Sequence, residues 1–134
     1  YFDILLKEQL KEPVKICLQI IKEAVSQIIF VSLAIFGSYA ENKHTEKSDL
    51  DIVALVNTDK DKRRCELAMK EAELKCMIPI DAHVFTKAEM LEMLKDRNEN
   101  LGKQIAAKHL AVNNPEILYS TINEGIANGF QIVH

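Results

Sequence analysis

Three aspartates and a Gly-Ser pair are the residues of this chain best suited to chemistry. Gly37 and Ser38 end an apolar run, and ten residues later Asp49 and Asp51 flank a leucine. Side chains alternate along a strand, so the two aspartates are expected to share one face. Neighbouring carboxylates repel, and a divalent cation between them removes the repulsion. The pattern therefore predicts a Mg²⁺ site.

A third carboxylate lies on a later segment. Asp81 interrupts an apolar run, and a strand buried between layers does not carry a lone charge without a partner. We therefore assign Asp81 to the same metal site as Asp49 and Asp51. The alternative is that Asp81 is an edge-strand charge that blocks aggregation. His83, two residues on, is expected on the same side of the strand, although a packed or surface histidine is the commoner case.

The segments that carry these residues are typical of buried strands. Strands are predicted at 28–36, 50–56 and 78–85, which are rich in Ile, Val, Leu and Phe. We expect the sheet to end with the third of them and the C-terminal third of the chain to be helical. Helices alternate with the strands, which predicts an α/β fold with a small mixed β-sheet packed against helices on one side.

Helix signals are clear in four places. Apolar residues recur at helical spacing over 14–25, after Pro13, and again over 65–72. Thr86 begins a T-x-x-E capping box, and Asn114 precedes a Pro-Glu pair that marks a helix start. Linkers, repeats and low-complexity segments are absent from the sequence, so residues 1–134 are predicted to form a single domain.

Composition narrows the function. The 134 residues are 48% hydrophobic and 28% charged, with a net charge of -3 and a pI near 5.8. Scattered Lys and Arg disfavour extended nucleic-acid binding, although a single nucleotide needs only a local site. The longest apolar run is about half of a membrane-spanning helix. We therefore expect no membrane segment and a cytoplasmic location. Three cysteines at unrelated spacings are predicted to be reduced.

The Gly-Ser pair and the aspartates resemble the minimal nucleotidyltransferases (MNT) of the DNA polymerase beta superfamily. The family motif is Gly-Ser, ten residues and Asp-x-Asp, with a third acidic residue on a later strand. Here it reads Gly37 and Ser38, then Asp49 and Asp51, then Asp81. The likeness covers Ile28 to about Phe85, and the length and helical ends are similar to stand-alone archaeal and bacterial members. It implies a polymerase-beta-like nucleotidyltransferase fold.

The resemblance also implies an activity and partners. Gly37 and Ser38 would hold the phosphates of a nucleoside triphosphate, which is ATP by family precedent, while Asp49, Asp51 and Asp81 would bind Mg²⁺. A nucleoside monophosphate, most often AMP in the family, is then transferred to a hydroxyl group. Small members are commonly encoded beside a HEPN toxin that they neutralise, so a partner protein is the leading acceptor. A homodimer is a further hypothesis.

One departure from the family keeps a second hypothesis open. Many members continue the motif with Ala-Arg-Gly, whereas this chain has Ala40, Glu41 and Asn42. An acidic side chain thus replaces a basic one beside the phosphates. The alternative to an active enzyme is therefore an inactive antitoxin, a binding module that neutralises its partner by contact. Ser38 and Glu41 also form S-x-x-E, so Ser38 could merely cap a short helix.

Two other parts of the chain carry basic residues that could contact the phosphates. Lys43 could replace the missing arginine. The charge run from Lys60 to Arg64 is best interpreted as a solvated helix start. Modification of a small molecule would require an acceptor cleft, which larger relatives build with an additional helical domain.

Overall fold

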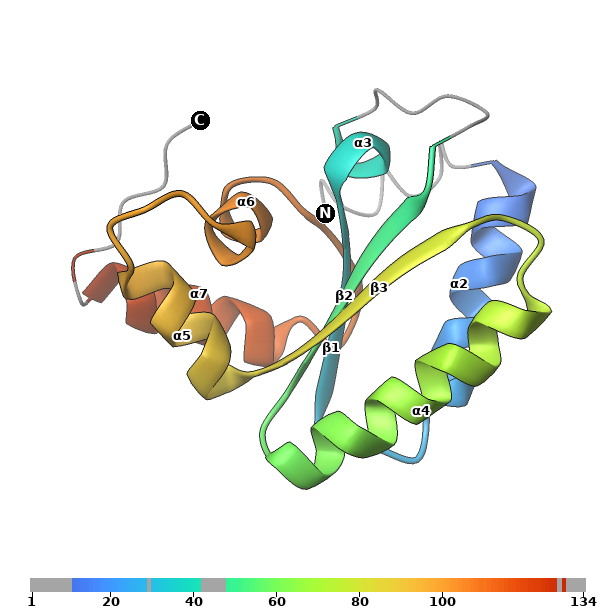
Figure 1. The fold of residues 1–134 in the computed structure, drawn as a ribbon, viewed down its shortest axis with the longest axis horizontal. Helices are drawn as coiled ribbons and strands as arrows, with labels where there is room; N and C mark the ends of the chain where they lie inside the picture. Colours follow the sequence, from blue (N-terminus) through green and yellow to red (C-terminus); the bar gives the residue numbers. More distant parts are fainter. Residues whose placement is uncertain (1–10, 29, 42–47, 128, 130–134) are drawn as a thin grey trace.

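A four-stranded mixed sheet runs through the middle of the protein (Figure 1). The computed structural model describes residues 11–28, 30–41, 48–127 and 129. The strands lie in the order β3 (Ile80–Thr86), β2 (Leu50–Val56), β1 (Val31–Phe36) and β4 (Leu110–Asn113). β2 and β3 are parallel, whereas β1 is antiparallel to both β2 and β4. The predicted α/β fold with a mixed sheet is confirmed.

Helices cover both faces of the sheet, so the expectation of helices on one side was wrong. One face carries α2 (Glu12–Ala24) and α4 (Asp59–Lys75), and the other carries α5 (Lys87–Lys95), α6 (Leu101–Ala107) and α7 (Glu116–Ala127) (Figure 1). A strand between two such layers must be apolar on both faces. All six residues of β1 are buried, and alternate ones enter opposite cores.

β4 is the strand that the sequence prediction missed, because the C-terminal third was expected to be helical. Leu110 pairs with Ile35 and Ala111 with Ala34, so β4 forms the edge of the sheet beside β1. The strand has four residues. Apolar periodicity cannot distinguish so short a segment from a helical turn, and the partner strand lies far away in the sequence.

Several local predictions are confirmed. Thr86 Oγ1 accepts the Glu89 amide at 3.2 Å, and the Glu89 carboxylate accepts the Thr86 amide at 2.9 Å, which completes the capping box. Pro13 lies in the first turn of α2, and α7 begins at Glu116, after Asn114 in a left-handed conformation.

No helix in the described ranges is long and apolar enough to cross a membrane.

Ser32 is a polar residue inside β1, and it ties the C-terminal elements to the sheet. Its side chain is 2% exposed. The hydroxyl donates to the Asn114 carbonyl oxygen and accepts the Leu118 amide at 3.2 Å. A buried hydroxyl with both bonds made is not destabilising, and it provides the Leu118 amide at the start of α7 with an acceptor. Ser32 thus joins β1 to the turn between β4 and α7.

Replacing Ser32 with alanine is predicted to lower the free energy of unfolding by about 1–3 kcal/mol, because the Leu118 amide then stays buried without an acceptor. Urea denaturation measures this. Ser120→Ala is the matched control, since Ser120 is exposed and bonds only within its own helix; its effect should stay below about 0.5 kcal/mol. Equal effects of the two changes would contradict the role given to Ser32.

Candidate functional site

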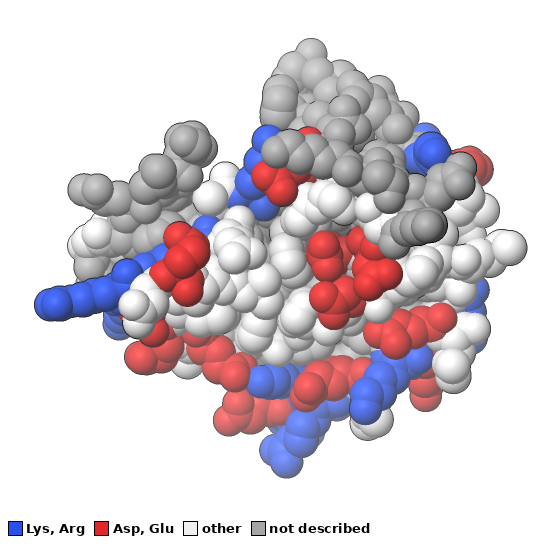
Figure 2. Space-filling view, turned by 45° about the horizontal axis from the view of Figure 1, so that its top comes forward, with Lys and Arg blue, Asp and Glu red and all other residues white. Residues whose placement is uncertain are grey.

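The aspartates meet where β1 ends and β2 and β3 begin. Phe36 pairs with Asp51, and Asp51 pairs with Asp81 in the parallel register. Directly paired residues point to the same face of a sheet, so the two carboxylates lie side by side. We call Asp51 and Asp81 the carboxylate pair. A view that brings this end of the sheet forward shows acidic side chains grouped near the middle of the face (Figure 2).

Gly37 packs directly against Asp51 of the carboxylate pair. It begins the short helix α3 (Gly37–Ala40) with a φ of 69°. A Cβ atom at this position would lie 2.2 Å from Asp51 Oδ2. The left-handed backbone and the close contact each require glycine here. Gly37 therefore allows the backbone at the end of β1 to approach a carboxylate that any larger residue would displace.

The surroundings of Asp51 disfavour its charged form. Partial burial raises the pKa of Asp51, and the neighbouring Asp81, through its charge and a hydrogen bond, raises it further. Asp49 adds a smaller contribution in the same direction, while His83 lowers the pKa. A carboxyl group in this environment is stabilised by a shared proton or by a cation. Asp51 and Asp81 thus lie side by side, as predicted, and their electrostatic repulsion favours a positive charge beside them.

His83 belongs to the site, although the sequence favoured a packed or surface histidine. Its Nε2 lies 3.2 Å from Asp81 Oδ2. The imidazole is held by two aromatic rings: its centroid lies 5.8 Å from that of Phe36 and 6.1 Å from that of Phe85, which it stacks upon. The spacing of two residues from Asp81 was the available signal. His83 therefore orients the Asp81 carboxylate.

Asp49 and Ser38 lie at the margin of the site. β2 begins at Leu50, as predicted, and the exposed Asp49 immediately precedes it. The expectation that Asp49 and Asp51 alternate along one strand is therefore not met, although the charge of Asp49 raises the pKa of Asp51. Ser38 is half-exposed in the first turn of α3. Phe36 occupies the N-cap position, and no side-chain hydrogen bond caps the helix. The alternative in which Ser38 serves as a helix cap is therefore wrong.

The chemistry of the donors fits a magnesium ion that is shared with phosphates. Across the described ranges, no group of three or more His, Cys, Asp and Glu side chains is arranged to hold a metal. The carboxylate pair thus offers two protein ligands and not a closed cage. Mg²⁺ in phosphate-transferring sites is commonly held by one or two carboxylates together with phosphate oxygens. Asp49 as a further ligand stays a prediction.

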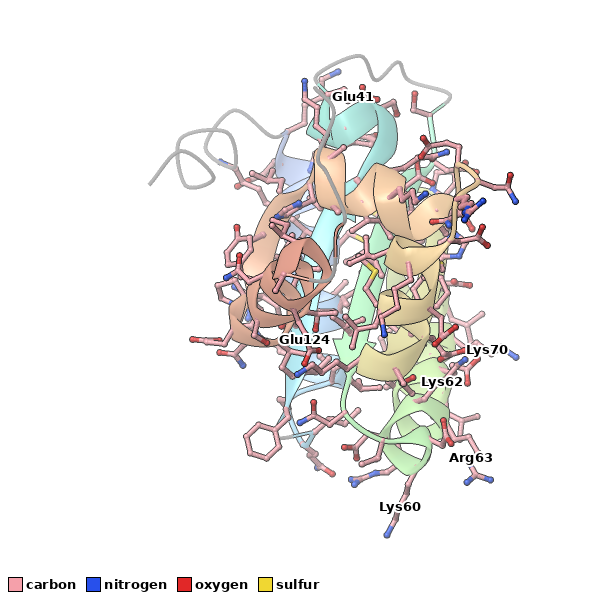
Figure 3. The ribbon with its side chains drawn as sticks, turned by 90° about the vertical axis from the view of Figure 1, so that its left-hand side faces the viewer. Glu41, Lys60, Lys62, Arg63, Lys70 and Glu124 are labelled. Atoms are coloured by element: carbon pink, nitrogen blue, oxygen red, sulfur yellow. The ribbon has the colours of Figure 1, made fainter. Side chains whose placement is uncertain are left out.

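The basic side chains at the start of α4 lie far from this site. Glu41 ends α3, and Lys60, Lys62 and Arg63 lie at the opposite end of the molecule (Figure 3). Lys62 is bound to Glu89, with its Nζ 2.8 Å from a carboxylate oxygen. The charge run that begins at Lys60 is thus a solvated helix start, as interpreted from the sequence. Lys43, the other basic residue considered, lies outside the described residues.

Comparison with known proteins gives a family and a fold. The family model described as "Nucleotidyltransferase domain" matches residues 14–109, which include every predicted site residue. A solved structure described as a crystal structure of a toxin-antitoxin with AMP-PNP is similar, with a TM-score of 0.51 and 13% sequence identity over 83% of this chain and 85% of that one. At such identity the likeness concerns the fold alone. No curated protein matches significantly.

Gly37→Ala is predicted to lower the free energy of unfolding by about 2–5 kcal/mol, through left-handed strain and the clash with Asp51. Gly129→Ala is the matched control: Gly129 also has a positive φ, but a Cβ there meets nothing within 4 Å. It should show only the strain, about 1–2 kcal/mol. Urea denaturation of both variants measures the two losses in the free energy of unfolding. Equal losses would mean that the contact with Asp51 is unimportant.

Asp51→Asn is predicted to raise the Tm of the metal-free protein at pH 7. The pKa of Asp51 is raised in the folded state. The stability that this one group contributes is therefore fully present below its pKa in the unfolded chain, and it is lost as the pH rises through its pKa in the folded protein. The neutral amide of the variant avoids that loss, and the Tm values of the wild type and of Asp51→Asn should converge near pH 3. Thermal melts with a chelator measure this. Glu71→Gln, at an exposed position of α4, should leave the Tm unchanged at both pH values. A lower Tm for Asp51→Asn at pH 7 would refute the prediction.

Proposed function

Since the chain belongs to the nucleotidyltransferase domain family, we propose that this enzyme transfers a nucleoside monophosphate to a hydroxyl group in a Mg²⁺-dependent reaction. The donor is ATP, the transferred group AMP, and the acceptor lies on a partner protein. The observation that carries the proposal is the carboxylate pair at one end of the sheet, with Asp51 packed against Gly37. Two carboxylates that need a cation, beside a backbone without a side chain, suit a metal-bound triphosphate.

In this reaction the acceptor oxygen forms a bond to the α-phosphorus, the bond from that phosphorus to its bridging oxygen breaks, and pyrophosphate leaves. Gly37 and Ser38 hold the phosphates through the backbone and the Ser38 hydroxyl. Asp81 accepts the proton of the acceptor hydroxyl, and His83, 3.2 Å away, fixes the position of that carboxylate.

Asp51 and Asp81 would hold Mg²⁺, and Asp49, at the margin of the site, would be a further ligand. Bound Mg²⁺ supplies charge neutralisation for the triphosphate and polarises the reacting phosphate. The raised pKa of Asp51 supports this assignment, because burial and Asp81 both disfavour a carboxylate there without a counter-charge. The same neighbours that disfavour the charged form of Asp51 thus favour a bound cation. Mg²⁺ is proposed over larger cations because few protein ligands are offered.

A toxin protein is the acceptor that we propose, and the HEPN class is the leading one. The similar solved structure is described as a toxin-antitoxin with AMP-PNP, an ATP analogue, and its fold covers most of this chain. A cytoplasmic location suits such a partner. A homodimer remains a prediction.

A second function is favoured by Glu41, which is exposed at the end of α3. A carboxylate beside the phosphate site repels a triphosphate, and the basic run of α4 lies at the other end of the molecule (Figure 3). On this hypothesis the chain neutralises its partner by contact, and the motif no longer supports catalysis. The two functions differ in whether a covalent nucleotide appears on the partner.

The deciding experiment is label transfer from each of the four α-labelled ribonucleoside triphosphates, with Mg²⁺ and host lysate. We expect a labelled protein with ATP, and a loss of at least about 100-fold in the Asp49→Asn, Asp51→Asn double variant. The matched control is the Asp59→Asn, Asp61→Asn double variant. It removes the same two charges at the start of α4 and should retain the transfer.

Absence of label from all four nucleotides, with a folded protein and a recovered partner, would reject the enzymatic proposal and favour neutralisation by contact. Glu41→Arg is then the informative variant. Recovery of transfer would assign the defect to this one charge. Glu71→Arg, which changes the charge equally on the exposed surface of α4, should not restore activity.

A further inference from the structure

Two thiols from distant parts of the sequence touch beside the sheet. Cys17 belongs to α2, and Cys76 follows the last residue of α4. Their Sγ atoms lie 2.7 Å apart, although 59 positions separate them in the chain. Both cysteines are free. The packing of α2 against α4 therefore brings the two sulfur atoms within reach of a covalent bond.

We propose that Cys17 and Cys76 form a reversible intramolecular disulfide when the protein meets a small disulfide oxidant. The bond requires only a small approach of the sulfur atoms, since a disulfide is about 2.05 Å long. The site is independent of the carboxylate pair and of nucleotide chemistry. It is an oxidative modification site built into the contact between α2 and the end of α4.

The different burial of the two cysteines assigns their roles. Cys17 is 1% exposed, whereas Cys76 is partly exposed. Burial, and to a lesser extent the neighbouring Cys76, raises the pKa of Cys17, so Cys17 stays protonated and out of reach of an external reagent. Cys76 is therefore the thiol that meets the oxidant first. Cys17 is the thiol that resolves the product.

The exchange balances in two steps. The Cys76 thiolate attacks one sulfur of the small disulfide, the bond between its two sulfurs breaks, and one small thiol leaves. Cys17 then attacks Cys76 Sγ, which breaks the mixed disulfide, and its proton passes to the departing small thiolate, which is released as the second small thiol. The protein loses two hydrogen atoms, that is two protons and two electrons, and the oxidant becomes two thiols.

The disulfide would fix the segment between α4 and β3, which leads to Asp81 of the carboxylate pair. Cys76 lies between α4 and β3, and the Pro79 carbonyl in the same connection accepts the Leu50 amide at 2.9 Å. Asp81 follows two residues after that proline. A disulfide to Cys17 would tie this connection to α2 and close a loop of about sixty residues in the unfolded chain, which lowers the entropy of the unfolded state.

Cys65 provides the internal control. It lies within α4, is 0% exposed, and burial raises its pKa to about 12. Among the described residues no other thiol contacts Cys65, and it is free. Cys65 should therefore react neither with an external disulfide nor with Cys17 while the protein is folded.

The test is to oxidise the purified full chain with oxidised glutathione and to measure the intact mass, the linked peptides and the Tm. We expect a mass loss of two hydrogen atoms, a single cross-link between Cys17 and Cys76, and a monomeric product. The Tm should rise by about 5–15 °C and return after dithiothreitol. Cys65→Ala should behave like the wild type.

Two further variants define the order of events. Cys17→Ala should stop at a glutathione adduct on Cys76, whereas Cys76→Ala should gain neither a cross-link nor an adduct. A stable glutathione adduct on wild-type Cys76, a cross-link between two chains, or a cross-link that includes Cys65 would overturn the proposal. The wild-type measurement stands alone if a variant fails to fold.

Discussion

The register of three neighbouring strands is the constraint on which the site depends. Phe36, Asp51 and Asp81 lie in one row across β1, β2 and β3. A slip of one residue in β2 would turn Asp51 toward α2 and α4 and expose Leu50, because neighbouring residues face opposite sides. The burial of Leu50 and its alternate neighbours opposes that slip. The apolar core thus holds two repelling carboxylates in place.

The proposed function and the stability of the fold make opposite demands at this row. Burial and the neighbouring charge leave Asp51 in an environment that disfavours ionisation, and Gly37 adopts a backbone that few other residues accept. Both features weaken the isolated protein locally, and the two surrounding cores compensate. Such local conflicts are expected where a site must receive a charged ligand, since a site already neutralised by its own side chains would bind a cation weakly.

The sequence predicted local features better than long-range ones. The strand at β2, the capping box at Thr86 and the approach of Asp51 to Asp81 follow from alternation, side-chain chemistry and motif spacing. β4 was not predictable, because four apolar residues have no distinctive period and their partner is distant. The second helical layer and the rings around His83 depend on tertiary packing, which no local pattern specifies.

The position of β4 also affects synthesis of the chain. β1 is complete at Phe36, but the strand that covers its outer edge begins at Leu110. At about 5–20 residues per second, a ribosome needs roughly 4–15 s to make the intervening segment. During that interval the nascent β1 has unpaired backbone groups along a strand that is apolar except for Ser32, a template for intermolecular association. Chaperone demand should therefore be greatest before residue 110 emerges and should fall once β4 can pair.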